Sequence, residues 1–158
     1  ERIDVTIHRQ SIVHSMVEFS DGSIKAQLGP TSMGLPIQHA LFYPERQPNK
    51  NLPKLDAVTM GPLTFERMNE ALYPCFQLAL EYGTQGGTYP AVLAGADEAA
   101  VALFLNGYIK FTQIPEVVLE TLSKHENTSE PSVEDIGNSA RWGIESTLAR
   151  HKKPTIVN

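Results

Sequence analysis

The segment from residue 11 to residue 28 constrains the fold most, because it predicts a β-hairpin with apolar side chains on both faces. In its first strand Val17 and Phe19 fall on one face, and Ile12 and Met16 fall on the other. A sheet that is apolar on both faces needs cover on both sides. The rest of the sequence offers helices for one side at most, so we expect an incomplete first domain.

The turn chemistry around this segment supports antiparallel pairing. Asp21-Gly22 is typical of a tight hairpin turn, because glycine adopts positive φ without steric cost. The return strand is predicted from Ser23 to Leu28, and Gly29-Pro30 ends it. The alternation of apolar and polar residues over positions 2–7 predicts a further, earlier strand.

The chain changes character after residue 35. Pro36 favours a short helix over residues 37–42, since a proline in the first helical turn gives up no needed hydrogen bond. The prolines and asparagines that follow predict an extended linker. We therefore expect a sheet segment at 1–42, a linker at 43–62 and a helical domain at 63–158.

Four amphipathic helices are predicted in the last domain, each with recognisable end signals. The first begins at Pro74 and is stopped by Gly83, and the second runs from about Thr88 to Asn106. A third follows a Thr112 cap, and a fourth opens with the capping box at residues 132–135. Short connections between them favour a four-helix bundle, which makes the predicted fold class α+β.

Composition excludes several function classes. The 158 residues are 41% hydrophobic and 20% charged, which is ordinary globular usage. A net charge of -5 argues against binding to nucleic acid, and no apolar run is long enough for a membrane span. The single cysteine, Cys75, fits a reducing compartment, so we expect a cytoplasmic protein.

Histidines are the main candidates for chemistry. His8 and His14 with Asp4 nearby could ligate zinc, although ordinary hydrogen bonding is the better explanation for them. The other three, His39, His125 and His151, are expected at the surface.

Two further sets of side chains are candidates for a site. Ser11 and His14 are three apart in a predicted strand, so their side chains should point to opposite faces, which excludes a nucleophile and base pair. Met16 is expected in the core, whereas Met33 lies in a loop with a glycine at each end, typical of a mobile lid. Asp97 and Glu98 are expected on a solvated helix face.

Several stretches resemble the C-terminal region of the 1-deoxy-D-xylulose-5-phosphate (DXP) reductoisomerase family. In chain order they are I-D-V-T-I-H-R-Q-S-I-V-H-S-M-V at 3–17, D-G-S-I-K-A-Q-L-G at 21–29, L-P-I-Q-H-A-L at 35–41, L-T-F at 63–65, Y-P-C-F-Q-L-A at 73–79, G-G-T-Y-P-A-V-L at 86–93 and F-T-Q-I-P at 111–115. The resemblance runs nearly end to end in the correct order, and it covers roughly the last two-fifths of the family's chain.

The resemblance implies part of an enzyme that isomerises and then reduces a sugar phosphate. The family converts DXP to 2-C-methyl-D-erythritol 4-phosphate for non-mevalonate isoprenoid synthesis, using NADPH and Mg²⁺ or Mn²⁺. It implies that Ser11 and His14 lie on the substrate side, and that Gly29 and Met33 lie near the nicotinamide. It also implies a homodimer through the sheet region, in the bacterial cytoplasm or a plastid.

The same resemblance implies that much of the active site lies elsewhere. The family's NADPH loop, its metal ligands and most of its phosphate-binding residues fall upstream of Glu1, so we expect no metal ligand here and an inactive chain in isolation. Residues 29–34 replace the family's G-x-P-D-M-R, and residues 94–98 replace N-A-A-N-E. Gly95 is expected to cost about 1 kcal/mol relative to alanine within a helix.

Two alternatives remain open on the sequence alone. The chain could be a non-catalytic assembly or regulatory module derived from the same fold. It could also be an unrelated histidine metalloprotein, which would hold stoichiometric metal on its own.

Overall fold

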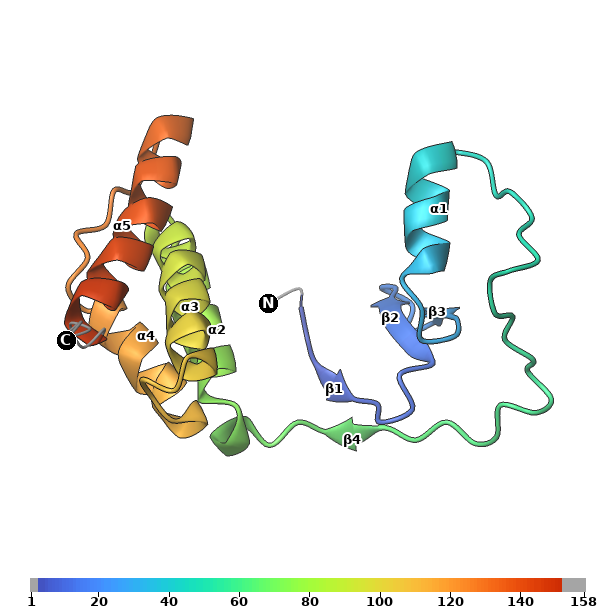
Figure 1. Cartoon of the computed structure of the whole chain (residues 1–158). Helices are drawn as coiled ribbons and strands as arrows, with labels where there is room; N and C mark the ends of the chain where they lie inside the picture. The colour runs from blue at the N-terminus through green and yellow to red at the C-terminus, as the bar shows by residue number, and fades with distance from the viewer. Residues whose placement is uncertain (1–2, 152–158) are drawn as a thin grey trace, which may run out of the picture. The chain divides into compact units, whose positions relative to one another are not determined.

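A computed structural model describes residues 3–151, and it divides the chain into two compact units between Met68 and Asn69 (Figure 1). Short antiparallel strands and one helix make up the first unit, and α-helices dominate the second. The predicted α+β class is therefore confirmed, with five α-helices and two two-stranded sheets among the described residues. No helix in residues 3–151 is long and apolar enough to cross a membrane.

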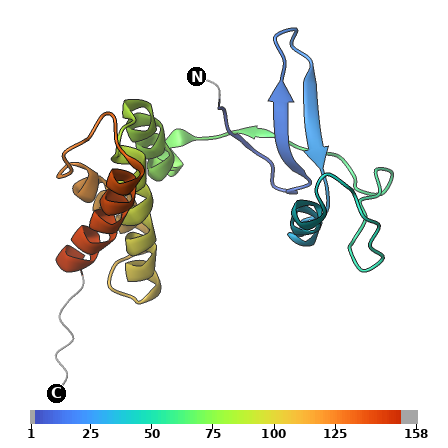
Figure 2. The same ribbon diagram turned by 90° about the horizontal axis from the view of Figure 1, so that it is seen from above.

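The predicted hairpin is present as β2 (Val13–Glu18) and β3 (Ile24–Leu28), which Figure 2 shows as an extended pair. Gly22 adopts φ of 81° in the turn, and the Asp21 carboxylate accepts hydrogen bonds from the backbone and hydroxyl of Ser23. Apart from the half-buried Val13, the residues of both strands are exposed. Met16, expected in the core, is 43% exposed, because β2 packs extensively only against β3 among the described elements.

A second, short sheet pairs β1 (Thr6–Ile7) with β4 (Glu66–Arg67), a strand that the sequence did not predict. The predicted first strand is therefore shorter than expected, at two residues. Side chains reinforce the pairing: Arg9 makes a two-pronged ion pair with the Glu66 carboxylate, with N–O distances of 2.9 and 3.1 Å. Segments about sixty residues apart are thereby joined within the first unit.

Helix α1 (Gly34–Phe42) begins earlier than predicted, with Pro36 inside its first turn. The Ser32 hydroxyl accepts a hydrogen bond from the Gly34 amide at 3.2 Å and satisfies one of the free donors at this end. Residues 43–62, predicted as a linker, contain no helix or strand and belong to the first unit. The predicted domain boundaries themselves stay a prediction.

The second unit contains α2 (Pro74–Gln85), α3 (Tyr89–Leu105), α4 (Ile114–Leu122) and α5 (Val133–His151), with 3-10 turns at Glu70–Leu72 and Phe111–Gln113. Helix α3 packs against the other three. The buried apolar core lies on their facing sides and comprises Tyr82, Val92, Ala96, Ala100, Ile114, Val117, Val118 and Leu122.

Helix ends differ from prediction in two places. Helix α2 continues past Gly83 and ends at Gln85, and the capping residue Gly86 has a φ of 68°, which suits a residue without a side chain. Helix α4 is preceded by Gln113, whose side chain accepts from the Lys110 amide at 2.8 Å, rather than by a Thr112 cap. The capping box before α5 is confirmed, since the Ser132 hydroxyl accepts from the Asp135 amide at 3.1 Å.

Helices α3 and α5 approach closely where each carries a buried glycine. A Cβ on Gly143 would lie 2.8 Å from the Val92 carbonyl oxygen, and a Cβ on Gly95 would collide with the Ala140 carbonyl oxygen. The sequence-based view of Gly95 as a helix-weakening residue is therefore incomplete. Its missing side chain is what lets the two backbones meet.

Candidate functional site

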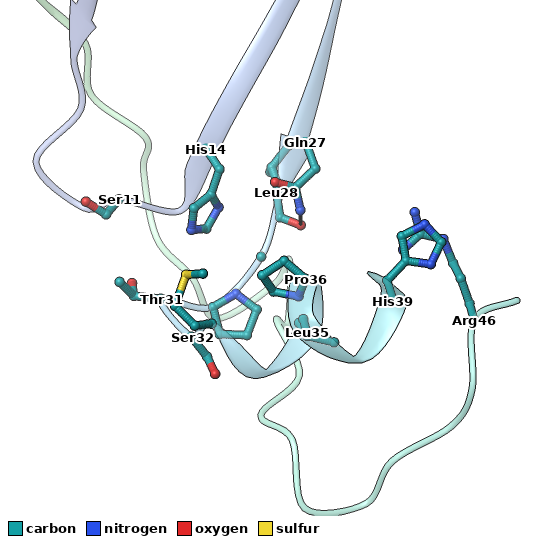
Figure 3. Close-up of a pocket in the computed structure, with 13 residues that line it drawn as sticks. Ser11, His14, Gln27, Leu28, Thr31, Ser32, Leu35, Pro36, His39 and Arg46 are labelled. Carbon is teal, nitrogen blue, oxygen red and sulfur yellow. Dashed lines mark hydrogen bonds between the residues drawn. The ribbon is translucent and has the colours of Figure 1, made fainter. Parts of the chain in front are cut away.

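A cavity of about 670 Å³ lies in the first unit, where the hairpin meets the N-terminal half of α1 (Figure 3). The four residues predicted as site residues, Ser11, His14, Gly29 and Met33, all line it. They come from three separate parts of the chain: the approach to β2, the strand β2 itself and the loop after β3. The fold thus brings four residues from separate parts of the sequence into the lining of one cavity.

Ser11 reaches the cavity because it lies outside the strand. It adopts φ of 51°, which is uncommon for a residue with a side chain, and its amide donates to the His8 carbonyl at 3.1 Å. The prediction that Ser11 and His14 point to opposite faces is wrong. It assumed a strand from residue 11, whereas β2 begins at Val13.

His14 reaches the same cavity through an irregularity in the hairpin. The register between β2 and β3 shifts between Val13 and Ser15, so that His14 is an extra residue in the strand. Such a bulge breaks the alternation of faces and redirects a side chain. Nothing in the sequence pattern indicates this bulge.

Gly29 lies near the His14 ring and is the one buried residue between positions 3 and 68. Its amide donates to the Ile12 carbonyl at 3.0 Å, which ties the start of the loop to the hairpin. A Cβ at this position would lie 4.0 Å from His14 Cε1 and 3.5 Å from Gln27 Nε2. A methyl group there would be in ordinary contact, so space alone does not require glycine.

Met33 lies at the start of α1 with 70% of its surface exposed. The next residue, Gly34, is tightly enclosed, since a Cβ there would lie 2.6 Å from Leu52 Cδ2. Leu52 belongs to the predicted linker, so the residues after α1 fold back against this loop. The arginine of the family pattern at position 34 would require Leu52 to move.

The opposite side of the cavity carries two residues that sequence reasoning did not select for a site. Figure 3 shows His39 and Arg46 on this side, away from Ser11 and His14. His39 was predicted at the surface, and Arg46 fell in the predicted linker. No local signal identifies either one, because their proximity depends on how residues 43–51 fold back along α1.

The N-terminal histidine takes a structural role in this fold. His8 Nδ1 donates to the Thr64 carbonyl at 2.7 Å, and its ring stacks on Phe65 with centroids 4.6 Å apart. Within residues 3–151, no group of three or more histidine, cysteine or acidic side chains is arranged to hold a metal ion.

The histidines of the helical unit are not simple surface residues either. His125 Nε2 shares a 2.7 Å hydrogen bond with the hydroxyl of Thr88, which is 1% exposed, and burial lowers the pKa of His125 below its ordinary value. His151 Nε2 lies 3.2 Å from a Glu120 carboxylate oxygen. Surface placement is therefore wrong for His125 because the loop after α4 packs onto the start of α3. Asp97 and Glu98 are exposed, as predicted.

Comparisons with known proteins agree on one family. The DXP reductoisomerase C-terminal domain family matches residues 28–145. The reductoisomerases of Pelotomaculum thermopropionicum and Acetivibrio thermocellus are 51% and 49% identical to this chain over 141 and 140 residues. Each alignment covers 89% of this chain and 36% of the relative, so the chain spans little more than a third of those proteins.

Solved structures give the same result. The Zymomonas mobilis reductoisomerase in complex with NADPH matches with a TM-score of 0.82 and 35% identity, covering 94% of this chain and 39% of the other. A DOX-P reductoisomerase in complex with NADPH, fosmidomycin and magnesium matches with a TM-score of 0.77 and 32% identity, covering 93% and 38%. Given the family match over most of its length and the identity to these relatives, this chain belongs to the DXP reductoisomerase family and corresponds to its C-terminal region.

Proposed function

We propose that this chain forms the C-terminal part of a DXP reductoisomerase, which isomerises DXP and reduces the product to 2-C-methyl-D-erythritol 4-phosphate with NADPH and a divalent metal. The observation that carries the proposal is the shared cavity of Ser11, His14, Gly29 and Met33 in a chain of this family. These are the residues that the family resemblance associates with the substrate and the nicotinamide.

Ser11 and His14 are proposed to orient the sugar phosphate. A serine hydroxyl both donates and accepts hydrogen bonds, and an imidazole can do the same through its two nitrogens. Neither side chain has a hydrogen bond to another residue in the described part of the chain. Both are therefore available to substrate hydroxyl groups or to an ordered water.

Gly29 and Met33 are proposed to face the nicotinamide ring. The loop fits a flat ring on two counts: the exposed thioether of Met33 is flexible, and Leu28, Leu35 and Pro36 give the cavity an apolar wall. NADPH supplies the hydride when it is bound. The role of this chain is to cover the ring and to limit access of water.

The metal does not fit the described residues, because they hold no suitable cluster of ligands. No step that uses the metal is assigned to this chain. We propose that the metal ligands, together with the NADPH loop, come from residues outside the 158 of this chain.

The remaining architecture follows from the same proposal. We propose domains at 1–42 and 63–158 joined by a linker, with α2 to α5 as a four-helix bundle. The exposed apolar hairpin, in which Val17 and Ile24 are 57% and 59% exposed, supports a homodimer through this sheet. Relatives from bacteria support a cytoplasmic location.

A chimera tests the proposed function. This chain would replace the aligned 141 residues of the Pelotomaculum thermopropionicum reductoisomerase, and NADPH oxidation would be followed after addition of DXP and Mg²⁺. We expect turnover in the chimera and none in the isolated chain. Ser11→Ala and His14→Gln should lower kcat/KM, whereas Ser15→Ala, on an exposed strand position next to His14, should not.

The outcomes separate the proposed enzyme from the regulatory module. A folded, dimeric chimera without turnover would support a non-catalytic module and contradict the proposal. Turnover by the isolated chain would contradict the claim that the other catalytic parts lie elsewhere.

A further inference from the structure

The charge of the cavity differs from that of the whole chain. Although the chain carries a net charge of -5, the cavity lining includes Arg46, His14 and His39 and contains no aspartate or glutamate. Hydroxyl groups of Ser11, Thr31 and Ser32 complete its polar part. A lining that donates hydrogen bonds and holds no carboxylate suits an anionic ligand.

Arg46 is available for such a ligand. In the described part of the chain its guanidinium makes no ion pair or hydrogen bond. The nearest acid in sequence, Glu45, has its carboxylate bound by the side-chain amide of Gln47. Arg46 therefore has no carboxylate in direct ion-pair contact among residues 3–151.

Hydrogen bonds fix the loop that carries Arg46. Gln38, in α1, donates through Nε2 to the Gln47 carbonyl at 2.6 Å and accepts through Oε1 from Asn49 at 2.7 Å. These two bonds close residues 45–49 over the helix that bears His39, directly after Gln38. The residues that follow Arg46 are therefore tied to α1, which places Arg46 at the edge of the cavity.

His39 is oriented as well. Its Nδ1 lies 3.4 Å from the Glu45 carbonyl oxygen, and the Tyr43 ring packs against it at an angle, with centroids 5.6 Å apart. The other ring nitrogen, Nε2, has no hydrogen-bond partner among residues 3–151. Because Nε2 has no such partner, it is available to form a hydrogen bond with a ligand.

We propose that His39 and Arg46 form a binding subsite for a phosphate oxyanion. The planar guanidinium matches two phosphate oxygens at once, and such charge-assisted bonds are about twice as strong as neutral ones. The subsite lies across the cavity from Ser11 and His14. The proposal rests on the cavity geometry and does not depend on the proposed function. If that function is correct, both the cofactor and the substrate carry a phosphate group that could bind here.

Titration of the full chain with inorganic phosphate tests the subsite directly. Nuclear magnetic resonance of the Arg46 Nε–H and the His39 ring would be followed at constant ionic strength maintained with chloride. We expect saturable shifts of both groups, with affinity about tenfold weaker in Arg46→Gln. Lys50→Gln removes an exposed cation outside the cavity lining and should leave the affinity unchanged.

Some results would overturn the subsite. Chemical-shift changes that do not saturate with phosphate would indicate nonspecific screening of charge. An affinity for phosphate that is weakened equally in Arg46→Gln and Lys50→Gln would indicate the same. If the hairpin resonances are dispersed as in a folded sheet and phosphate still causes no shift, the subsite does not bind phosphate and the proposal is wrong. Because phosphate is the only probe, this result is independent of whether the enzyme chimera turns over.

The chimera then identifies which phosphate the subsite takes. If the phosphate belongs to the cofactor, Arg46→Gln should raise the KM for NADPH about tenfold at unchanged kcat. A rise in the KM for DXP alone would assign it to the substrate. Phosphate binding with neither KM changed would assign it to free phosphate, whereas a fall in kcat alone would contradict a binding role.

Discussion

Gly95 of α3 lies directly against the backbone carbonyl of Ala140 in α5, so close that the glycine has no room for a side chain. Helices this near each other gain packing contacts along their backbones, and the helix-weakening cost of glycine is offset by that contact. The family pattern has alanine at this position. The close crossing of α3 and α5 leads to a specific prediction for the stability of the helical unit.

Gly95→Ala should destabilise the helical unit by about 1–3 kcal/mol, because the added methyl group forces α3 and α5 apart. Gly83→Ala is the matched control: Gly83 lies inside α2 with open space where its Cβ would be. That variant should be stabilised by about 0.5–1 kcal/mol. Urea unfolding followed by Trp142 fluorescence measures both, since Trp142 is the only tryptophan. Equal stabilisation of the two variants would contradict the close crossing.

Acid should weaken the helical unit through His125. Burial lowers its pKa in the folded state below the ordinary value of 6.5, while the nearby Glu126 opposes this in part. As the pH falls below 6.5, the unfolded chain takes up a proton at His125 that the folded chain does not, which favours unfolding. We therefore expect the free energy of unfolding to decrease from about pH 7.5 to about pH 5.5.

His125→Gln should flatten this pH dependence, whereas His39→Gln, in the other unit, should leave it unchanged. The lowered pKa values of Glu120 and Asp135 act in a separate window, because their ordinary values are 4.5 and 3.8. Urea midpoints measured by Trp142 fluorescence across this range provide the test. An unchanged slope in His125→Gln would contradict the assignment.

Two buried hydroxyl groups join α4 to α5. Thr121 and Thr147, both 0% exposed, share a hydrogen bond of 2.8 Å. Thr147→Val should lower the free energy of unfolding by about 1 kcal/mol. The cost stays modest because the Thr121 hydroxyl can still donate to the Val117 carbonyl. The double variant with Thr121→Val should cost less than the sum of the single changes, since no hydroxyl is then left without a partner. A double-mutant cycle of unfolding free energies decides this.

Gln10 is expected to position Ser11 at the cavity. Its side-chain nitrogen donates to the Thr64 hydroxyl at 2.8 Å and to the Pro62 carbonyl at 3.2 Å, so it anchors the backbone just before Ser11. In the chimera, Gln10→Ala should lower kcat/KM without changing metal affinity, and it should speed amide hydrogen exchange at Ser11. Gln85→Ala, at the end of α2, serves as the control. Normal exchange at Ser11 in Gln10→Ala would contradict the positioning role.

The sequence by itself determined the local elements of this protein. Alternation of apolar residues and an Asp21-Gly22 turn predict the hairpin, and Ser132 with Asp135 predicts the start of α5, because these signals act over a few residues. Family motifs likewise selected Ser11, His14, Gly29 and Met33, and all four line one cavity.

Only the tertiary structure decided how those elements meet. The bulge that turns His14, the fold-back of Arg46 along α1, the burial of His125 on Thr88 and the contact of Gly95 with Ala140 all depend on partners distant in sequence or on register between strands. Periodicity and capping signals report each residue's own neighbours along the chain. They contain no information about which distant backbone or side chain will lie against it, and packing settles that.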